Sequence, residues 1–301
     1  MLRRSSRRGA ALILVLWLVA ALSLSVLAGS RSVRQYTRAT DIDLERIQAG
    51  LVLDAARSIA MQAWLGAGAR GGYRTWHVQL GDADVQLEVI PAEGLLDVSV
   101  ASDALMNAFF QRVGKLPPGE AAIMTSRIRD YIDPDDTPGG IGGAEAPQYK
   151  AAGWPVSPRN GALVDASDLR MVLGMTPELY DIIAPYLSVD GQQHIAIDAA
   201  PPVLIDALSG QPGLGARIHS SSPEMRTSTL QSAVMAELFG AASSSGGPIK
   251  VVARMQTGQG HWWERQAWMD LRNRPDTLTP WTTLSLENVR RVPPPAGEER
   301  P

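Results

Sequence analysis

Five carboxylates lie close together in one glycine-rich stretch, RDYIDPDDTPGGIGGAEAPQY, near the middle of this chain of 301 residues. They are Asp130, Asp133, Asp135, Asp136 and Glu145. Calcium takes about six to eight oxygen ligands, and glycines let a loop turn its backbone carbonyls inward. Carboxylates repel one another without a cation, so the stretch predicts a calcium site of uncertain ion number. The alternative is a solvated acidic loop with Asx-turns, and the spacing is not that of an EF-hand.

A second stretch, DLRMVLGMTPELYDIIAPYL, places Gly174 between two short predicted helices. Such a helix–hairpin–helix can bind a DNA phosphate with its backbone amides when basic residues lie nearby. Here only Arg170 is close, while Glu178 and Asp181 are acidic. We therefore expect a hairpin used for packing, and we keep a membrane-anchored DNA-uptake or DNA-binding protein as the alternative function.

The remaining composition excludes several kinds of site. The chain has no cysteine, which excludes disulfides and a thiolate zinc site. The net charge is -3 and no basic stripe follows the N-terminus, so nucleic acid is not an expected partner. The four histidines form no metal-ligand pair and no hydrolase motif occurs, so the chain is predicted not to be an enzyme. An anchored calcium-dependent hydrolase remains a third interpretation.

The N-terminus predicts a membrane segment. Four arginines within residues 1–8 precede an apolar run from Ala10 to Ala28, and no charge follows until Arg31. A helix of that length spans roughly the 30 Å hydrocarbon core, and the arginines stay cytoplasmic. Three interpretations compete: a signal peptide cut near Gly29, a plain anchor, and a basic leader that is cut after Gly9, as in type IV prepilins.

The helical pattern continues beyond the apolar run. From residue 31 to about residue 65 there is no proline, and apolar residues recur at steps of three and four. We therefore predict one long helix that ends at the glycines of residues 66–72. Two alternating stretches, residues 73–80 and 83–90, predict a hairpin that turns at Gly81-Asp82.

The middle of the chain is predicted to be helical. Helices are expected over 102–113, with Ser102 as cap, and over 118–132, then a long loop over 133–162. Further short helices are expected after Asp165 or Ser167 and after Thr176. An extended piece and a helix should fill 195–210, and a last helix 223–239. Strands return at 248–257 and 261–272, joined by a glycine-containing turn.

The predicted fold class is α+β: a pilin-like long N-terminal helix packs on an antiparallel sheet, with an inserted all-helical domain. The expected boundaries are a leader at 1–9, a transmembrane part at 10–30, spine and first strands at 31–100, the insert at 101–245, returning strands at 246–290 and a disordered tail at 291–301.

Four stretches in this order resemble one family: RRGAALILVLWLV, RIRDYIDPDDTP with GGAE, LVDASDLRMVLGMTPELYDIIAPYLSV, and IAIDAAPPVL. Together they resemble the K-type minor pseudopilins of the type II secretion system, the general secretion pathway protein K family. The resemblance runs from Arg3 to about Arg272. Two departures are Asp198-Ala199, where the family usually has Asn-Thr, and Ala146-Pro147, where it often has more acidic residues.

The resemblance implies processing and a place in an assembly. Prepilin peptidase would cut after Gly9 and methylate the new amine of Ala10. The fifth mature residue would be Leu14, where most pilins carry a glutamate that pairs with a neighbouring subunit's amine inside the bilayer. A subunit with nothing above it has no such amine to pair, which fits the tip of the pseudopilus.

The family further implies I-type and J-type minor pseudopilins, the inner membrane and the secretion machinery as partners. The expected protein is a single-pass inner-membrane protein with a cytoplasmic N-terminus and a periplasmic C-terminal domain. Its expected role is to initiate the pseudopilus and to support export of folded proteins across the outer membrane.

Overall fold

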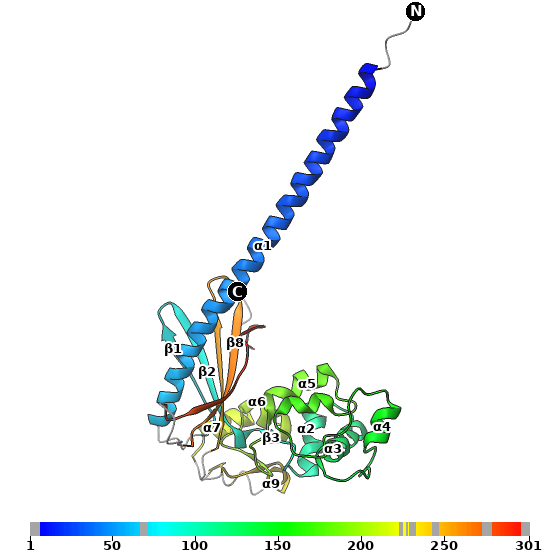
Figure 1. Cartoon of the computed structure of the whole chain (residues 1–301). Helices are drawn as coiled ribbons and strands as arrows, with labels where there is room; N and C mark the ends of the chain where they lie inside the picture. The colour runs from blue at the N-terminus through cyan, green and yellow to red at the C-terminus, as the bar shows by residue number, and fades with distance from the viewer. Residues whose placement is uncertain are drawn as a thin grey trace, which may run out of the picture.

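The structure, a computed structural model, describes residues 7–66, 72–222, 225, 226, 228, 233–242, 247–272 and 279–295. Within these ranges it does not describe the side chains of 7–12, 25–39, 233 and 234. A single long helix projects from a head that consists of a sheet and a mainly helical unit (Figure 1).

The long helix α1 covers Arg7–Gly66 without a break, which confirms the predicted single helix. Its last third packs on the sheet through one face, whose buried members include Leu53, Ala56 and Ala60. These residues recur at three- and four-residue steps, as one face of a helix requires. Among the described residues, no helix combines the length and the apolar character needed to cross a bilayer.

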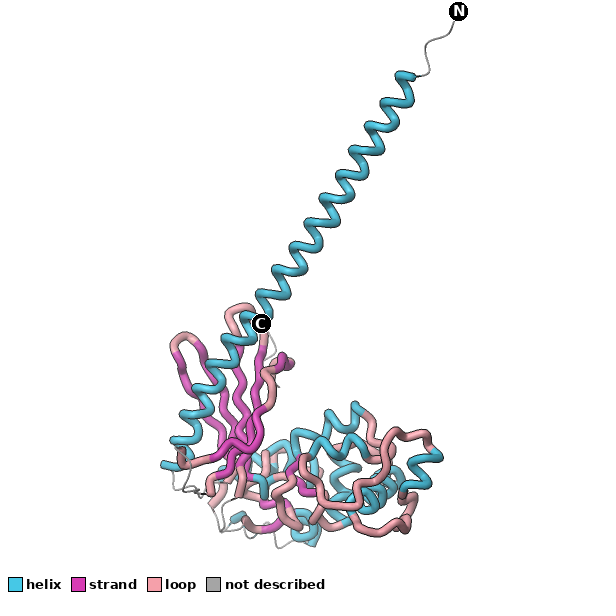
Figure 2. The backbone as a smooth tube through the Cα atoms, viewed as in Figure 1, coloured by secondary structure: helices cyan, strands magenta, loops and turns pink. Residues whose placement is uncertain are grey.

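Six strands form the sheet on which α1 lies (Figure 2). The order is β1-β2-β7-β8-β10, β9 pairs with β8 beside β10, and every pair is antiparallel. The bounds are β1 Arg74–Leu80, β2 Ala83–Pro91, β7 Ile249–Gln256, β8 Trp262–Asp270, β9 Thr282–Leu286 and β10 Arg290–Val292. The four strands predicted from alternation are confirmed, including the turn at Gly81-Asp82.

The core of this layer lies between α1 and one face of the sheet. In β2 the buried side chains are Val85, Leu87 and Val89, every second residue, because successive side chains of a strand point to opposite faces. Val251 of β7 and Trp263 of β8 complete the apolar surface under the helix.

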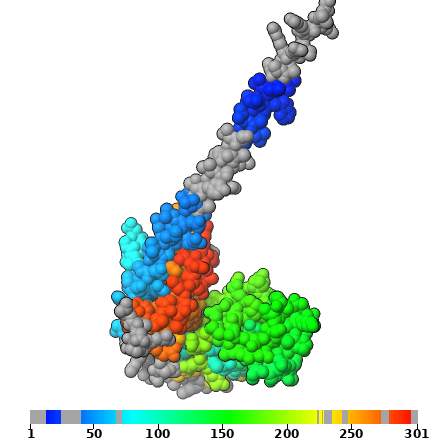
Figure 3. Space-filling model, in the orientation of Figure 1, coloured from blue at the N-terminus to red at the C-terminus, as the bar shows by residue number. Residues whose placement is uncertain are grey.

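The second unit is mainly helical and is inserted between β2 and β7. Its helices are η1 Ala92–Gly94, α2 Asp103–Arg112, α3 Pro118–Ile132, α4 Ala146–Ala151, η2 Ala166–Met171, α5 Pro177–Ile183, η3 Ala184–Tyr186, α6 Pro202–Ser209, α7 Leu214–Ser220 and α9 Ala233–Leu238. A separate core holds them together around Phe109, Phe110 and Tyr149. Figure 3 shows the green part of this unit beside the later strands of the sheet, which are orange and red.

Three predicted helix caps can be checked directly. The hydroxyl of Ser102 accepts from the N–H of Leu105, and that of Thr176 accepts from the N–H of Leu179. Between the two candidates for the cap of η2, the structure selects Asp165, whose carboxylate accepts from the N–H of Ser167.

The insert is not all helical, which corrects the sequence-based prediction. Two parallel pairs of very short strands occur in it: β3 Leu96–Asp97 with β4 Leu187–Ser188, and β5 Ile195–Ala196 with β6 Phe239–Gly240. Each strand has only two residues, too few for a period-two pattern. Because Leu96 and Val98 already belong to the core of the helical unit, this unit begins before residue 101.

Other boundaries also differ from the prediction. Helix α4 lies inside the expected loop 133–162, with Pro147 in its first turn. The expected helix 223–239 is described as a helix over Ala233–Leu238, and residues 223, 224, 227 and 229–232 lie outside the described residues. Strand β10 includes the first two residues of the expected disordered tail, whose last residues, 296–301, are outside the description.

Close backbone contacts join the two units. The N–H of Tyr73 donates to the carbonyl of Asp198 at 2.9 Å. A Cβ on Gly94 would lie 2.0 Å from the carbonyl oxygen of Ala199, so only glycine fits there. The buried ammonium of Lys250 in β7 donates to the carbonyl of Pro185 at 3.1 Å. These contacts pack the helical unit directly against the lower end of the sheet.

Candidate metal centre

Three carboxylates converge after the end of α3. One oxygen each of Asp133, Asp135 and Glu145 lies within 4.8 Å of the others. Asp133 is the residue that ends α3, and Glu145 is the residue that begins α4. The cluster therefore joins the ends of two helices that the intervening loop connects.

Asp130 shapes the loop from its inner side. This buried carboxylate accepts from the N–H of Gly139 at 3.0 Å and from the N–H of Ala144 at 2.6 Å. Asp130 does not belong to the converging group, although the sequence predicted it as a ligand. Its last-turn position in α3 directs it to the backbone of the returning loop instead.

Glycine at position 143 allows that close approach. A Cβ there would lie 2.1 Å from the carbonyl oxygen of Gly139 and 2.3 Å from an oxygen of Asp130. Gly140 has a φ of +57°, which residues with a side chain rarely adopt. Glycine is therefore required for the close approach at Gly143 and for the backbone conformation at Gly140, whereas inward-turned carbonyls stay a prediction.

Asp136 also lies outside the converging group, and its partner is a residue that the sequence did not indicate. One oxygen of Asp136 accepts from the side-chain amide of Asn160 at 3.1 Å. The same amide donates to the carbonyl of Asp135, and the N–H of Asn160 donates to Tyr131. The dipeptide Asn160-Gly161 signals only a turn, so no spacing rule links it to a loop about two dozen residues away.

Burial and mutual repulsion disfavour the fully ionised state of the clustered carboxylates. The pKa of Glu145 is raised to about 7, first by burial and then by the nearby carboxylates of Asp130 and Asp133. Burial and then Asp135 raise the pKa of Asp133. Both side-chain oxygens of Glu145 and one of Asp133 are buried without a hydrogen-bond partner among the described residues. Buried polar atoms are normally paired, and an unpaired buried charge is costly.

This donor set fits a hard divalent cation. All the converging atoms are carboxylate oxygens, which suit calcium, magnesium or manganese rather than zinc or copper. A cation would pair with the orphaned oxygens of Glu145 and remove the repulsion among the carboxylates. Its chemical effect would be to fix the end of α3 against the start of α4.

The hairpin around Gly174 is engaged in internal contacts. The N–H of Leu173 donates to the hydroxyl of buried Tyr149 at 2.9 Å, and its carbonyl accepts from Arg127 at 3.0 Å. Arg127 also donates to Gly142 of the acidic loop. The guanidinium of Arg170 lies over the ring of Tyr180. These contacts favour the packing interpretation over a phosphate-binding hairpin.

The remaining predicted residues lie at the far end of α1. Gly9 and Ala10 belong to the helix by their backbone, but their surroundings are outside the described side chains. Leu14 is exposed on the isolated helix. Cleavage after Gly9 and the role of Leu14 stay predictions.

Comparisons with known proteins agree on one family. Residues 93–191 match the family described as type II secretion system, protein K, and this range includes the acidic loop. Type II secretion system protein K of Pectobacterium carotovorum subsp. carotovorum is 29% identical over an alignment of 212 residues, and the match covers 61% of this chain. The match spans 63% of that relative's length.

A solved structure resembles this fold over most of the chain. It is a chain of the GspK-GspI-GspJ complex from the type 2 secretion system of enterotoxigenic Escherichia coli. The TM-score is 0.56 at 15% sequence identity, and the superposition covers 83% of this chain and 98% of the other. At that identity the likeness establishes the α+β fold.

Proposed function

We propose that the chain belongs to the family of type II secretion system protein K and that it is a minor pseudopilin at the tip of the pseudopilus. In this role it assembles with other minor pseudopilins, initiates the pseudopilus and supports export of folded proteins. The role is structural, as is general for this family, and no catalytic step is proposed.

One architectural observation carries the proposal. A single helix of 60 residues begins outside the head and ends inside it, where it packs on an antiparallel sheet. Most of the stability of a helix in a protein comes from packing against neighbours. The part of α1 that extends beyond the head has no such neighbour among the described residues of this chain, so we expect it to pack in a bundle of similar helices.

The tip position rests on two further features. Leu14 supplies no carboxylate where a subunit stacked above would place its amine, and an unpaired charge inside a bilayer is unfavourable. The helical unit adds bulk beside the lower sheet (Figure 1). A subunit with such an extension is easiest to place where nothing stacks on top of it.

The partners are proposed to be I-type and J-type minor pseudopilins, and one face of α1 supports this. Leu44, Ile47 and Leu51 are 53%, 58% and 68% exposed and lie at helical spacing on the side away from the sheet core. An apolar stripe of this kind fits another helix. The similar solved structure is itself a complex of three such components.

Calcium is the proposed cofactor of the acidic loop. Asp133, Asp135 and Glu145 would provide carboxylate ligands, whereas Asp130 and Asp136 would stabilise the loop from outside. Calcium is preferred to magnesium because it tolerates the irregular geometry of a loop and takes more protein oxygens.

Processing at the N-terminus provides the direct test. Full-length protein would be expressed in a bacterium that has a type II secretion system, and the mature chain in the inner membrane would be measured by intact mass. We expect a chain that begins at methylated Ala10, produced by prepilin peptidase, with its C-terminal part in the periplasm. Gly9→Val should leave the leader in place.

A matched control is Gly29→Val, which alters the alternative cleavage region; the mature chain should still begin at Ala10, and its mass should differ from that of the parent only by the substitution itself. A mature chain that begins at Gly29 or Ser30 would contradict the proposal, since signal peptidase would then have removed the helix. A chain that retains Met1 would identify a plain anchor instead.

A further inference from the structure

Strand β1 is the outer strand of the sheet. The strand order ends with β1, and among the described residues no other strand pairs with its outer side. β1 pairs with β2 along its whole length, from Arg74 opposite Val89 to Leu80 opposite Ala83, without a shift in register. One edge of a regular strand of seven residues is therefore available for pairing.

The backbone groups on that edge can be assigned from the turn. Leu80 and Ala83 close a two-residue hairpin, so they form a hydrogen-bonded pair. In an antiparallel ladder bonded and non-bonded pairs alternate. The residues whose N–H and C=O groups point away from β2 are therefore Thr75, His77 and Gln79.

Apart from the charge of Arg74 at its first residue, the edge carries none of the usual devices that prevent pairing. Exposed edge strands are commonly protected by proline, lysine, a bulge or very short length. β1 contains no proline and no lysine, and its register shows no bulge. A regular, unprotected edge suits the addition of another strand.

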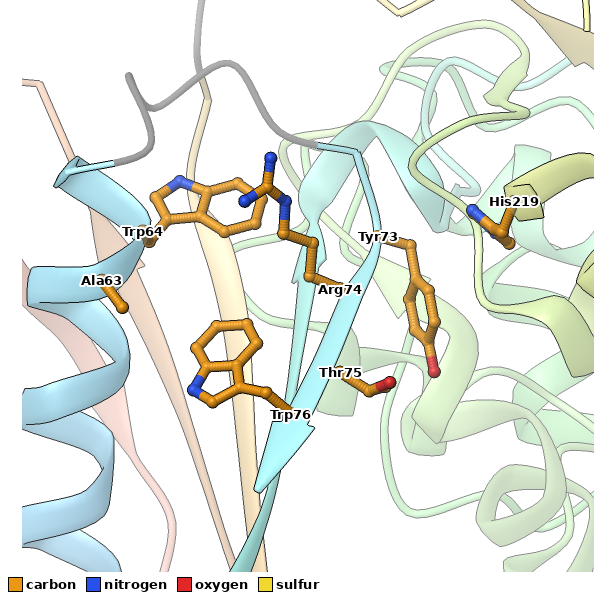
Figure 4. A pocket seen from close by; sticks show the side chains of 7 residues that line it. All are labelled: Ala63, Trp64, Tyr73, Arg74, Thr75, Trp76 and His219. Carbon is orange, nitrogen blue, oxygen red and sulfur yellow. The ribbon is translucent and has the colours of Figure 1, made fainter. Parts of the chain in front are cut away.

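A cavity of about 530 Å³ lies alongside the start of this edge (Figure 4). Arg74 and Trp76 point from β1 toward α1, whereas Tyr73 and Thr75 point the opposite way, toward His219. Successive side chains of a strand lie on opposite faces, so a cavity lined by both sets must extend past the edge itself. The cavity therefore lies where side chains of an added strand would project.

The cavity is rich in donors on aromatic walls. The exposed guanidinium of Arg74 lies 5.7 Å from the centre of the Trp64 ring, and no ion pair of Arg74 occurs among the described residues. The indole N–H of Trp64, which also lines the cavity, is buried without an acceptor there. A cation and an unpaired N–H favour a carboxylate as the side chain that enters.

We propose that β1 binds an extended segment of another protein as an additional strand, and that an acidic side chain of this segment pairs with Arg74. The backbone groups of Thr75, His77 and Gln79 supply the main-chain hydrogen bonds. The inference concerns only this edge and does not depend on the proposed place in the pseudopilus.

The test uses the full chain in detergent and labelled synthetic peptides. The peptides alternate valine and threonine, and each carries a single glutamate at a different position. Fluorescence polarisation should show binding of the peptide whose glutamate reaches Arg74. Replacing that glutamate by glutamine should weaken binding about tenfold, since a charge-assisted hydrogen bond is lost. Methylating the amides along one side of the peptide should abolish binding.

Two variants separate the contribution of the backbone hydrogen bonds of β1 from the contribution of the Arg74 side chain. His77→Pro removes an outward N–H but no backbone bond to β2, and proline is tolerated on an edge strand in this position. The side-chain contact of His77 with Asp84 of β2 is lost equally in His77→Pro and in His77→Ala. It should weaken binding about tenfold or more, whereas the matched control His77→Ala should bind like the parent. Arg74→Gln should make the glutamate and glutamine peptides equal. Circular dichroism melting would establish that each variant is folded.

Several outcomes would overturn the proposal. These are absence of binding by every peptide, equal binding of the methylated peptide, and equal binding by His77→Pro and His77→Ala. The parent chain could instead form a dimer that binds no peptide and that His77→Pro disrupts. That result would show that the edge of β1 pairs with a second copy of this chain. None of these results would bear on cleavage at Gly9, so failure here is distinct from failure of the pseudopilin assignment.

Discussion

Two buried carboxylates of the acidic loop have opposite surroundings. Asp130 accepts backbone N–H groups from Gly139 and Ala144, whereas both oxygens of Glu145 lack partners among the described residues. The sequence predicts both as ligands because both are carboxylates of one loop. It does not reveal which carboxylate is hydrogen-bonded by backbone N–H groups of the folded loop. Of the five predicted ligands, the structure brings together the carboxylate oxygens of Asp133, Asp135 and Glu145.

The raised pKa of Glu145 predicts a pH effect in the metal-free protein. The folded state holds the proton up to about pH 7, above the ordinary value of this group, so it binds more protons than the unfolded state between these values. Stability contributed by this group is present at low pH and is lost as the pH rises toward 7. Glu145→Gln should remove that dependence and stabilise the metal-free chain by roughly 1 kcal/mol near pH 8.

Thermal unfolding in chelator, at pH values from about 5 to about 8, would measure this difference. Glu120→Gln is the matched control, since Glu120 is exposed in the first turn of α3, and it should behave like the parent. Equal slopes for the parent and Glu145→Gln would contradict the prediction.

A second prediction concerns Gly143. Gly143→Ala places a methyl group against the backbone oxygen of Gly139 and the carboxylate of Asp130, and backbone cannot move aside cheaply. We expect a loss of about 2–3 kcal/mol in the free energy of unfolding, measured by denaturant titration. Gly119→Ala, where a Cβ meets nothing within 4 Å, should be neutral or stabilising. A loss of similar size in both variants would refute the steric explanation.

At the scale of helices and strands, elements with a strong hydrophobic periodicity could be predicted from the sequence, whereas elements with a weak periodicity could not. The long helix and strands β2 and β7 carry clear patterns of 3.6 and 2. Strand β9, TTLSL, is half exposed and mostly polar, so no alternation marks it. Helix α4 was missed because Pro147 was interpreted as a loop signal, although proline is well tolerated in a first helical turn.

The buried residue Glu45 joins α1 to the turn end of the β7–β8 hairpin. Its carboxylate accepts from the hydroxyl of Thr257, and His261 Nδ1 lies 2.8 Å from its second oxygen. Burial acts to raise the pKa of Glu45, but the hydrogen bonds from Thr257 and His261 outweigh it and lower the pKa. The stability from this group is therefore present near neutral pH and is lost as acid protonates it.

Glu45→Ala should destabilise the head by about 2–3 kcal/mol, because it leaves Thr257 and His261 without their acceptor. Denaturant unfolding near pH 7 would measure the loss, and the gap to the parent should shrink in acid. Asp43→Ala is the control, since Asp43 forms only an exposed ion pair with Arg46. Hydrogen exchange should show faster opening of the hairpin tip in Glu45→Ala alone, and uniform exchange would argue against a local joint.

For the whole molecule, two separate apolar cores predict two responses to calcium. One core lies under α1 and the other inside the helical unit, where the acidic loop is. Calcium at about one hundred times its dissociation constant should stabilise the unit that binds it by roughly 2.7 kcal/mol. Hydrogen exchange with calcium or chelator should show protection in α3 and α4 but not in β2 and β7. Equal protection of both units, or none, would count against the ion.

A change at Leu14 tests the place of the molecule in an assembly. Under the proposed insertion in the bilayer, Leu14→Glu puts a carboxylate where no neighbouring amine pairs with it, at a cost of about 2.5–3.5 kcal/mol. We expect a reduced amount of the protein in the membrane and reduced secretion, measured by immunoblot of both fractions. Leu14→Val should have no effect. Filaments built from the Leu14→Glu subunit alone, with secretion intact, would refute the tip position.

The strand pair at the base of the sheet has a further consequence. Pro91 and Ile249 lie directly opposite each other, and the N–H of Ala92 donates to the carbonyl of Pro248. The chain thus leaves the sheet and returns to it at one point, so the helical unit is a simple insertion between β2 and β7. Deleting this unit and joining β2 to β7 by a tight turn would leave an ordinary antiparallel hairpin. No strand of the sheet would then change its neighbours, which is compatible with gain of the helical unit as one insertion.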